Sequence, residues 1–116
     1  MEALRYIEAR TGNSTLYDIE HKKHIHNFGA SGTTTHTLTL AKVGLEMTFA
    51  SVVANKSLVI TAAGSDVIVD SGTQVTSAGG TMTNAAGSTA GNILKLVCLT
   101  PGYWHVIAKS GTWTAA

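Results

Sequence analysis

Histidines form the densest group of chemically versatile side chains in this sequence. His21, His24 and His26 lie within six consecutive positions, and in an extended chain the side chains of His24 and His26 point to the same side. Imidazole nitrogens bind first-row transition metals, but two of them from one chain make a weak site. A solvated basic segment, or histidines that hydrogen-bond to a partner surface, explains the pattern equally. We therefore predict no cofactor and no metal, with His24 and His26 as the weak metal candidates.

Two aspartates flank a short apolar run, and their spacing argues against glycoside hydrolysis. Asp66 and Asp70 are four positions apart, which along a strand places them roughly 13 Å from each other at a rise of about 3.3 Å per residue. The two carboxyl groups of a glycosidase lie only ~5 to 9.5 Å apart. Capping of the turns around residues 67–69 accounts better for both aspartates. The sequence also contains no Gly-x-Ser-x-Gly and no Gly-Lys-Ser/Thr motif, so we predict no enzymatic activity.

The aromatic residues near the C-terminus and the single cysteine are typical of a core. Tyr103, Trp104 and Trp113 offer ring faces for stacking on a sugar, but tryptophans in a terminal hairpin are usually buried. Cys98 lies inside the apolar run 93–99 and has no second cysteine to pair with. We predict that both tryptophans are core residues and that Cys98 is a buried, unreactive thiol.

Length and charge exclude several classes of protein. The 116 residues suit one domain, and 13% of them are charged, about half the usual ~25%. The net charge is +1 and no basic run exceeds the pair Lys22 and Lys23, which argues against nucleic-acid binding. No apolar stretch is long enough for a membrane helix, and the N-terminus does not resemble a signal peptide. We expect a protein made in the cytoplasm, with no nucleic-acid or membrane partner.

Charges and hydrophobic periodicity divide the chain near residue 35. Eight of the fifteen charged residues lie in the first 23 positions, and residues 1–35 have too few apolar side chains for a core of their own. We predict that residues 1–35 form an extended N-terminal arm that binds a partner. Residues 36–116 alternate with period two and carry turn signals. They predict an all-β knob, an antiparallel β-sandwich or small barrel of about seven to nine short strands.

The strands of this knob are expected at residues 36–40, 45–49, 56–61, 67–69, 93–99 and 103–108, with further candidates at residues 73–76 and 112–114. Pro101 and Gly102 between the last two strands predict a hairpin, since Pro fixes one φ angle of a tight turn and Gly supplies the positive one. Residues 71–92 carry no charge and are mostly small. For them we expect a short hairpin, residues 74–75 against 81–83, that packs against another subunit.

The order of these elements resembles a β-rich module of tailed-bacteriophage virion proteins, found in tail-fibre ends and in head decoration or head-fibre proteins. The similarity spans about residues 36–114. Its most specific part is the closing pattern, an apolar strand that ends in Cys98, a turn, an aromatic-led strand from Tyr103, and Gly111-Thr112-Trp113. The resemblance implies a homotrimeric structural or attachment domain without enzymatic activity.

A tail fibre carries a long shaft before such a module, whereas only about 35 residues precede it here. We therefore expect a capsid decoration (cement) protein on the capsid surface of the virion, bound as a trimer to the major capsid protein. The alternative is a receptor-binding tip or adhesin domain of a tail fibre or baseplate. The expected partner-binding residues all lie in the arm: the apolar Leu4, Tyr6, Ile7, Leu16, Tyr17, Ile19 and Phe28, and the basic Arg5, Arg10, Lys22 and Lys23.

Overall fold

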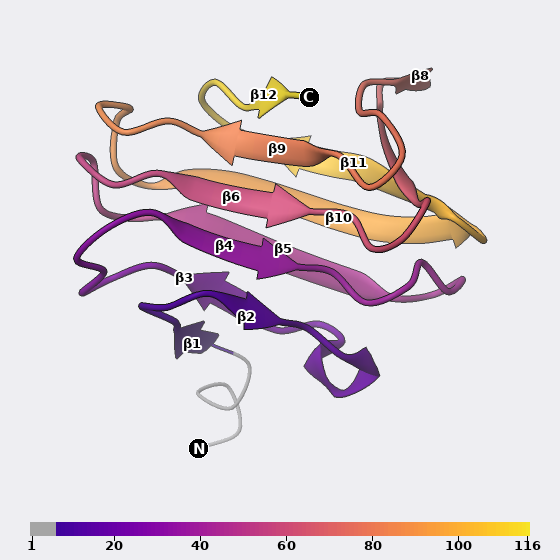
Figure 1. The fold of residues 1–116 in the computed structure, drawn as a ribbon, viewed down its shortest axis with the longest axis horizontal. Coiled ribbons are helices and arrows are strands. Elements are labelled where there is room, and N and C mark those ends of the chain that lie inside the picture. The colour runs from indigo at the N-terminus through magenta and orange to yellow at the C-terminus, as the bar shows by residue number, and fades with distance from the viewer. Residues whose placement is uncertain (1–6) are drawn as a thin grey trace.

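Two β-sheets pack face to face in the computed structural model, which describes residues 7–116 (Figure 1). Their facing layers confirm the predicted all-β sandwich. Sheet A has the strand order β1-β3-β5-β10-β11-β7-β8, and sheet B has the order β12-β9-β6-β4-β2. The strands of sheet A are β1 (Ile7–Ala9), β3 (His24–His26), β5 (Glu46–Ser51), β7 (Val67–Asp70), β8 (Thr73–Gln74), β10 (Asn92–Thr100) and β11 (Tyr103–Lys109). Those of sheet B are β2 (Ser14–Thr15), β4 (Thr34–Thr37), β6 (Leu58–Thr61), β9 (Thr81–Asn84) and β12 (Thr114–Ala115).

Alternating side chains from the two sheets build one core between the layers. In sheet A, Ile25, Phe49 and Leu94 lie side by side across β3, β5 and β10, and all three are buried. Burial of such side chains is the main favourable term in folding. The predicted burial of Trp104, Trp113 and Cys98 is confirmed, because all three belong to this core. The hydrophobic periodicity of the sequence therefore identified core side chains in the strands around Phe49 and Leu94, whereas Leu40 of the predicted strand 36–40 is exposed.

The first six strands wind as a flattened coil that passes back and forth between the sheets. β1, β3 and β5 are adjacent and parallel in sheet A, while β2, β4 and β6 are adjacent and parallel in sheet B. The sheets are therefore mixed rather than antiparallel. Of the twelve strands in residues 7–116, the nine from β4 to β12 agree with the seven to nine that were predicted for the knob. The prediction of a separate arm over residues 1–35 is wrong for residues 7–35. These residues have no core of their own, but each of their strands adds to the edge of a neighbouring strand.

The second half of the chain contains the predicted hairpin and one pairing that differs from the prediction. β10 and β11 are antiparallel and turn at Pro101 and Gly102, whose φ of 85° is the positive angle that glycine supplies. The expected hairpin of residues 74–75 with 81–83 is wrong, because β8 pairs with β7 in sheet A and β9 pairs with β6 in sheet B. No helix within residues 7–116 is long and apolar enough to cross a membrane.

Candidate functional site

Large apolar side chains are exposed at the end of the sandwich where β4 and β10 finish, at the right of Figure 1. They come from the loops after β2 and β4 and from the β10–β11 hairpin, and their exposed fractions run from 42% to 85%. An apolar cluster of this kind on a folded surface is typical of an interaction site. This set is the apolar end, and its members are Tyr17, Ile19, Leu40, Val43, Leu99 and Tyr103.

Hydrogen bonds between loops hold the apolar end in place. The backbone N–H of Ala41 donates to Oδ2 of Asp66 at 2.7 Å, and the N–H of Gly102 donates to the carbonyl of Ala41 at 3.2 Å. The N–H of Gly44 donates to the carbonyl of Cys98 at 2.9 Å. Asp66 is buried, and it caps the loop after β4 as well as standing before β7. A surface held by such contacts loses little conformational entropy when it binds.

An ion pair connects the loop after β2 to this end. The Asp18 carboxylate accepts hydrogen bonds from Nζ of Lys42 at 2.8 Å and from the hydroxyl of Thr39 at 3.3 Å. These bonds hold the pKa of Asp18 below its usual value. Both charged side chains are more than half exposed, so the pair contributes little to stability. It instead fixes Tyr17 and Ile19, which flank Asp18, beside the loop that carries Leu40 and Val43.

The predicted partner-binding residues separate into several groups. Tyr17 and Ile19 are exposed and belong to the apolar end, and the exposed Lys22 follows them closely in the chain. Phe28 is also exposed, but the loop that carries it connects β3 to β4 at the opposite end of the sandwich. Ile7 is exposed on the outer face of sheet A, opposite His24 in the strand register. Three further predicted residues lie outside the described residues: Leu4, Arg5 and Tyr6.

Leu16 is a correction to the sequence analysis. Its side chain is fully buried in the core and its N–H donates to the carbonyl of Thr37 at 2.7 Å. It cannot touch a partner while residues 7–35 are folded onto the sandwich. The extended backbone continues past the end of β2 and its side chains alternate, so that Leu16 is buried between the exposed Thr15 and Tyr17.

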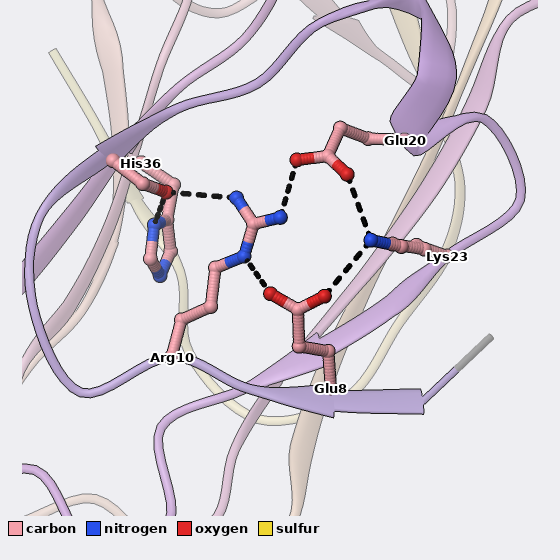
Figure 2. A network of polar contacts seen from close by, with 6 residues as sticks. Glu8, Arg10, Glu20, Lys23 and His36 are labelled. Carbon is pink, nitrogen blue, oxygen red and sulfur yellow. Dashed lines mark hydrogen bonds and ion pairs between the residues drawn. The ribbon is translucent and has the colours of Figure 1, made fainter. Parts of the chain in front are cut away.

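Arg10 and Lys23 meet two glutamates of the same chain rather than an open surface (Figure 2). Arg10 pairs with Glu8 and with Glu20, and Nζ of Lys23 lies 2.8 Å from Glu8 and 2.9 Å from Glu20. The four side chains form a closed charge ring of alternating sign. Hydrogen bonds from Arg10 and then from Lys23 lower the pKa of Glu8 to about 2. Such a ring satisfies its own charges and needs no acidic partner.

A buried histidine stands next to the charge ring. The Ser14 hydroxyl accepts a hydrogen bond from Nη1 of Arg10 at 3.1 Å and lies 2.7 Å from Nδ1 of His36. The imidazole of His36 stacks on Phe49 with ring centroids 6.3 Å apart, and its relative exposure is 0%. Burial, aided by the positive charge of Arg10, lowers the pKa of His36 to about 4. His36 is therefore a neutral core residue at neutral pH.

The histidines that the sequence singled out lie on the outer face of sheet A. His24 and His26 flank the buried Ile25 and point away from the core, on the same side of β3 as predicted. Together with Ile7 and Ile93 they line a shallow, mainly apolar groove of about 200 Å³. Nδ1 of His26 accepts a hydrogen bond from the N–H of Phe28 at 3.2 Å. No group of three or more metal-ligating side chains occurs among residues 7–116, and His24 and His26 stay weak metal candidates only.

The comparisons with known proteins add no assignment to this geometry: no family model matches the sequence, and a search of curated protein sequences finds no significant match. Four residues of the apolar end were not predicted as site residues: Leu40, Val43, Leu99 and Tyr103. Two of them, Leu99 and Tyr103, flank the Pro101-Gly102 turn. Large apolar residues on both sides of a tight turn are the signal that would have identified the hairpin tip as a contact surface.

Proposed function

We propose that this protein is a non-enzymatic structural component of a phage virion, a capsid decoration protein that binds the assembled shell through its apolar end. One observation carries the proposal: six large apolar side chains are exposed at one end of the sandwich, after β2, after β4 and on the β10–β11 hairpin, and hydrogen bonds connect these segments. Interfaces are dominated by a few buried apolar anchors with a polar rim. Asp18 and Lys42 form part of such a rim.

The mechanism that follows is thermodynamic. A protein that binds only the assembled shell stabilises that state by mass action. In the proposed homotrimer three apolar ends would act together, so that each additional contact occurs at a high effective concentration. A trimer would in this way bridge neighbouring subunits of the major capsid protein. The resemblance to phage virion modules, on residues 36–114, supports the trimeric state and the capsid partner.

Binding of variants to capsids tests this proposal. Ile19→Asp and Val43→Asp place a charge in the apolar end, and we expect each to weaken co-sedimentation with expanded, undecorated capsids at least tenfold. Phe28→Asp is the matched control, because Phe28 is equally exposed but lies at the opposite end. Wild-type protein that fails to sediment with capsids, or a Phe28→Asp loss as large as the other two, would refute the assignment of this surface. Analytical ultracentrifugation of free and capsid-bound protein tests the trimer separately.

A receptor-binding tip is a second candidate, and the exposure of two tyrosines at the apolar end favours it. Tyr17 and Tyr103 are both exposed on or beside loops, where aromatic rings can stack on the faces of sugars. The copy number in intact virions distinguishes the two functions. A decoration protein is present at a number of copies comparable to that of the coat protein, whereas a tip is present at far fewer. Loss of host-cell binding on Tyr17→Ala or Tyr103→Ala, with capsid binding absent, would favour the tip.

A further inference from the structure

The side of the sandwich between β1 and β2 is closed by charges instead of apolar side chains. β1 is the edge strand of sheet A and β2 is the edge strand of sheet B. The charge ring of Glu8, Arg10, Glu20 and Lys23 draws its residues from β1, from η2 (Asp18–Glu20) and from the turns beside them. Figure 2 shows the four side chains turned toward one another with His36 beside them. All of the ring lies within residues 8–23, so its ion pairs join parts of this segment to one another.

Few apolar side chains of this segment enter the core. Among the buried apolar residues, only Leu16 and Ile25 belong to residues 7–26, while the others come from residues 30–113. The attachments of the segment to the sandwich include two residues of β2, three of β3, the Asp18–Lys42 ion pair and the contact of Ser14 with His36. Segments with little buried apolar surface open at a lower free energy than the whole fold. The contact of Ser14 with the buried imidazole of His36 joins the segment to β4, and a proton on His36 acts directly on this attachment.

Every proton that binds at or beside the ring adds positive charge to it. At neutral pH two positive and two negative charges balance, and His36 is uncharged. A proton on Glu8 or Glu20 leaves Arg10 and Lys23 in excess. A proton on His36 places a second positive charge on the hydroxyl that Arg10 already contacts. The other strands that pack against His36 present no charge to it, because β5 contributes Phe49 and β6 contributes Ile60.

We propose that residues 7–26 are an acid-releasable latch: protonation of His36, which Ser14 contacts across the boundary, detaches this segment from β4 and β5, while residues 34–116 keep their fold. Release leaves the outer backbone groups of β4 and β5 unpaired, and such strand edges are ready to pair with a strand of another chain. The opening is a property of one protein molecule and requires no capsid or receptor. It is thus independent of the proposed function.

Amide hydrogen exchange followed residue by residue tests the latch. The amides of Leu16 and Thr48 report on it, because they donate to Thr37 and to Lys23 across its boundary. The amides of Ala62 and Cys98, which donate to Gly80 and to Leu45, report on the rest of the sandwich. Exchange rates are divided by those of an unstructured peptide at the same pH. Between pH 6.5 and pH 4 we expect the opening constant at Leu16 and Thr48 to rise about 80-fold, because His36 is half protonated in the open form at the first pH and in the closed form at the second.

His36→Gln keeps a hydrogen-bonding side chain but does not titrate, and we expect it to remove most of this rise. His24→Gln is the matched control on the outer face of sheet A and should behave as the wild type does. Protection that falls equally at Leu16, Thr48, Ala62 and Cys98 would mean that acid unfolds the whole protein, and it would overturn the proposal. The same conclusion follows if His36→Gln opens with the pH dependence of the wild type. If His36→Gln does not fold, the comparison of the two pairs of amides in the wild type still shows whether acid opens residues 7–26 alone or unfolds the whole protein.

Discussion

Replacing Leu16 by alanine separates the observed fold from the extended arm that the sequence suggests. The Leu16 side chain has 0% relative exposure and packs in the same core as Ile25 and Phe49. The substitution removes three carbon atoms, which is worth about 2.4 kcal/mol at roughly 0.8 kcal/mol per buried methylene. The cavity left behind adds to this, so the expected loss in the free energy of unfolding is about 3 kcal/mol.

Urea denaturation followed by tryptophan fluorescence measures this loss, since both tryptophans lie in the core. A loss of about 3 kcal/mol corresponds to a decrease in Tm of roughly 12 °C for a domain of this size. Ile19→Ala is the matched control, because Ile19 is 85% exposed and its truncation should change stability by no more than about 0.5 kcal/mol.

The reasoning would be refuted if Leu16→Ala cost less than about 1 kcal/mol with an unchanged m value. That outcome would mean that residues 7–26 contribute nothing to the cooperative unit and extend from it as an arm. An equal loss for Leu16→Ala and Ile19→Ala would contradict the side-chain alternation that places one inside and the other outside. Only a large loss for the first and a negligible one for the second agrees with the fold.

Three further perturbations have expected outcomes. The pKa of His36 falls from 6.5 in the unfolded chain to about 4 in the fold, so the unfolded chain takes up this proton first and the free energy of unfolding decreases by about 3 kcal/mol as the pH falls from 6.5 to 4. Glu8 continues the decrease between pH 4.5 and 2. Urea titrations between pH 6.5 and 4 should show no decrease if His36 is not buried. Gly111→Ala should lower Tm by several degrees, because Gly111 has a φ of 75° and a Cβ there would lie 2.3 Å from Cγ of Asn92; an unchanged Tm would contradict this packing. Burial raises the pKa of the Cys98 thiol, so the native protein should not react with an aromatic disulfide reagent that labels the urea-unfolded chain at once, and rapid labelling without urea would be inconsistent with the core.

Periodicity predicted the second half of the fold well because that half obeys local rules. The alternation along β5 and β10 and the Pro101-Gly102 turn between β10 and β11 are properties of neighbouring residues. The first half obeys a different rule. β1, β2 and β3 have two or three residues each, too few to show a period, and their parallel neighbours follow only after the chain has visited the other sheet. No short-range signal in the sequence encodes such a winding.

The candidate site was predictable in part for a similar reason. Tyr17 and Ile19 were predicted as partner-binding residues because they are apolar residues among charged ones. Leu40 was not predicted as such a residue, because residues 36–40 alternate in the sequence as one regular strand. In the structure β4 ends at Thr37 and Leu40 lies in an exposed loop. Nor does the sequence show that Asp66 reaches the backbone of Ala41, since this contact joins residues 25 positions apart. Exposure at the end of a strand depends on which loops meet there.

Charged residues near the N-terminus close one side of the sandwich. Four of the eight charged residues in the first 23 positions form the ring, where they neutralise one another. A partly buried ion pair adds little net stability compared with apolar side chains of the same volume, because taking the charges out of water opposes their attraction. Closure by charges is therefore weaker than closure by a leucine cluster would be, and it depends on pH where a leucine cluster would not. Because only Leu16 and Ile25 of this segment are buried apolar residues of the core, residues 7–26 are the part of the fold that we propose can open while the remainder stays closed.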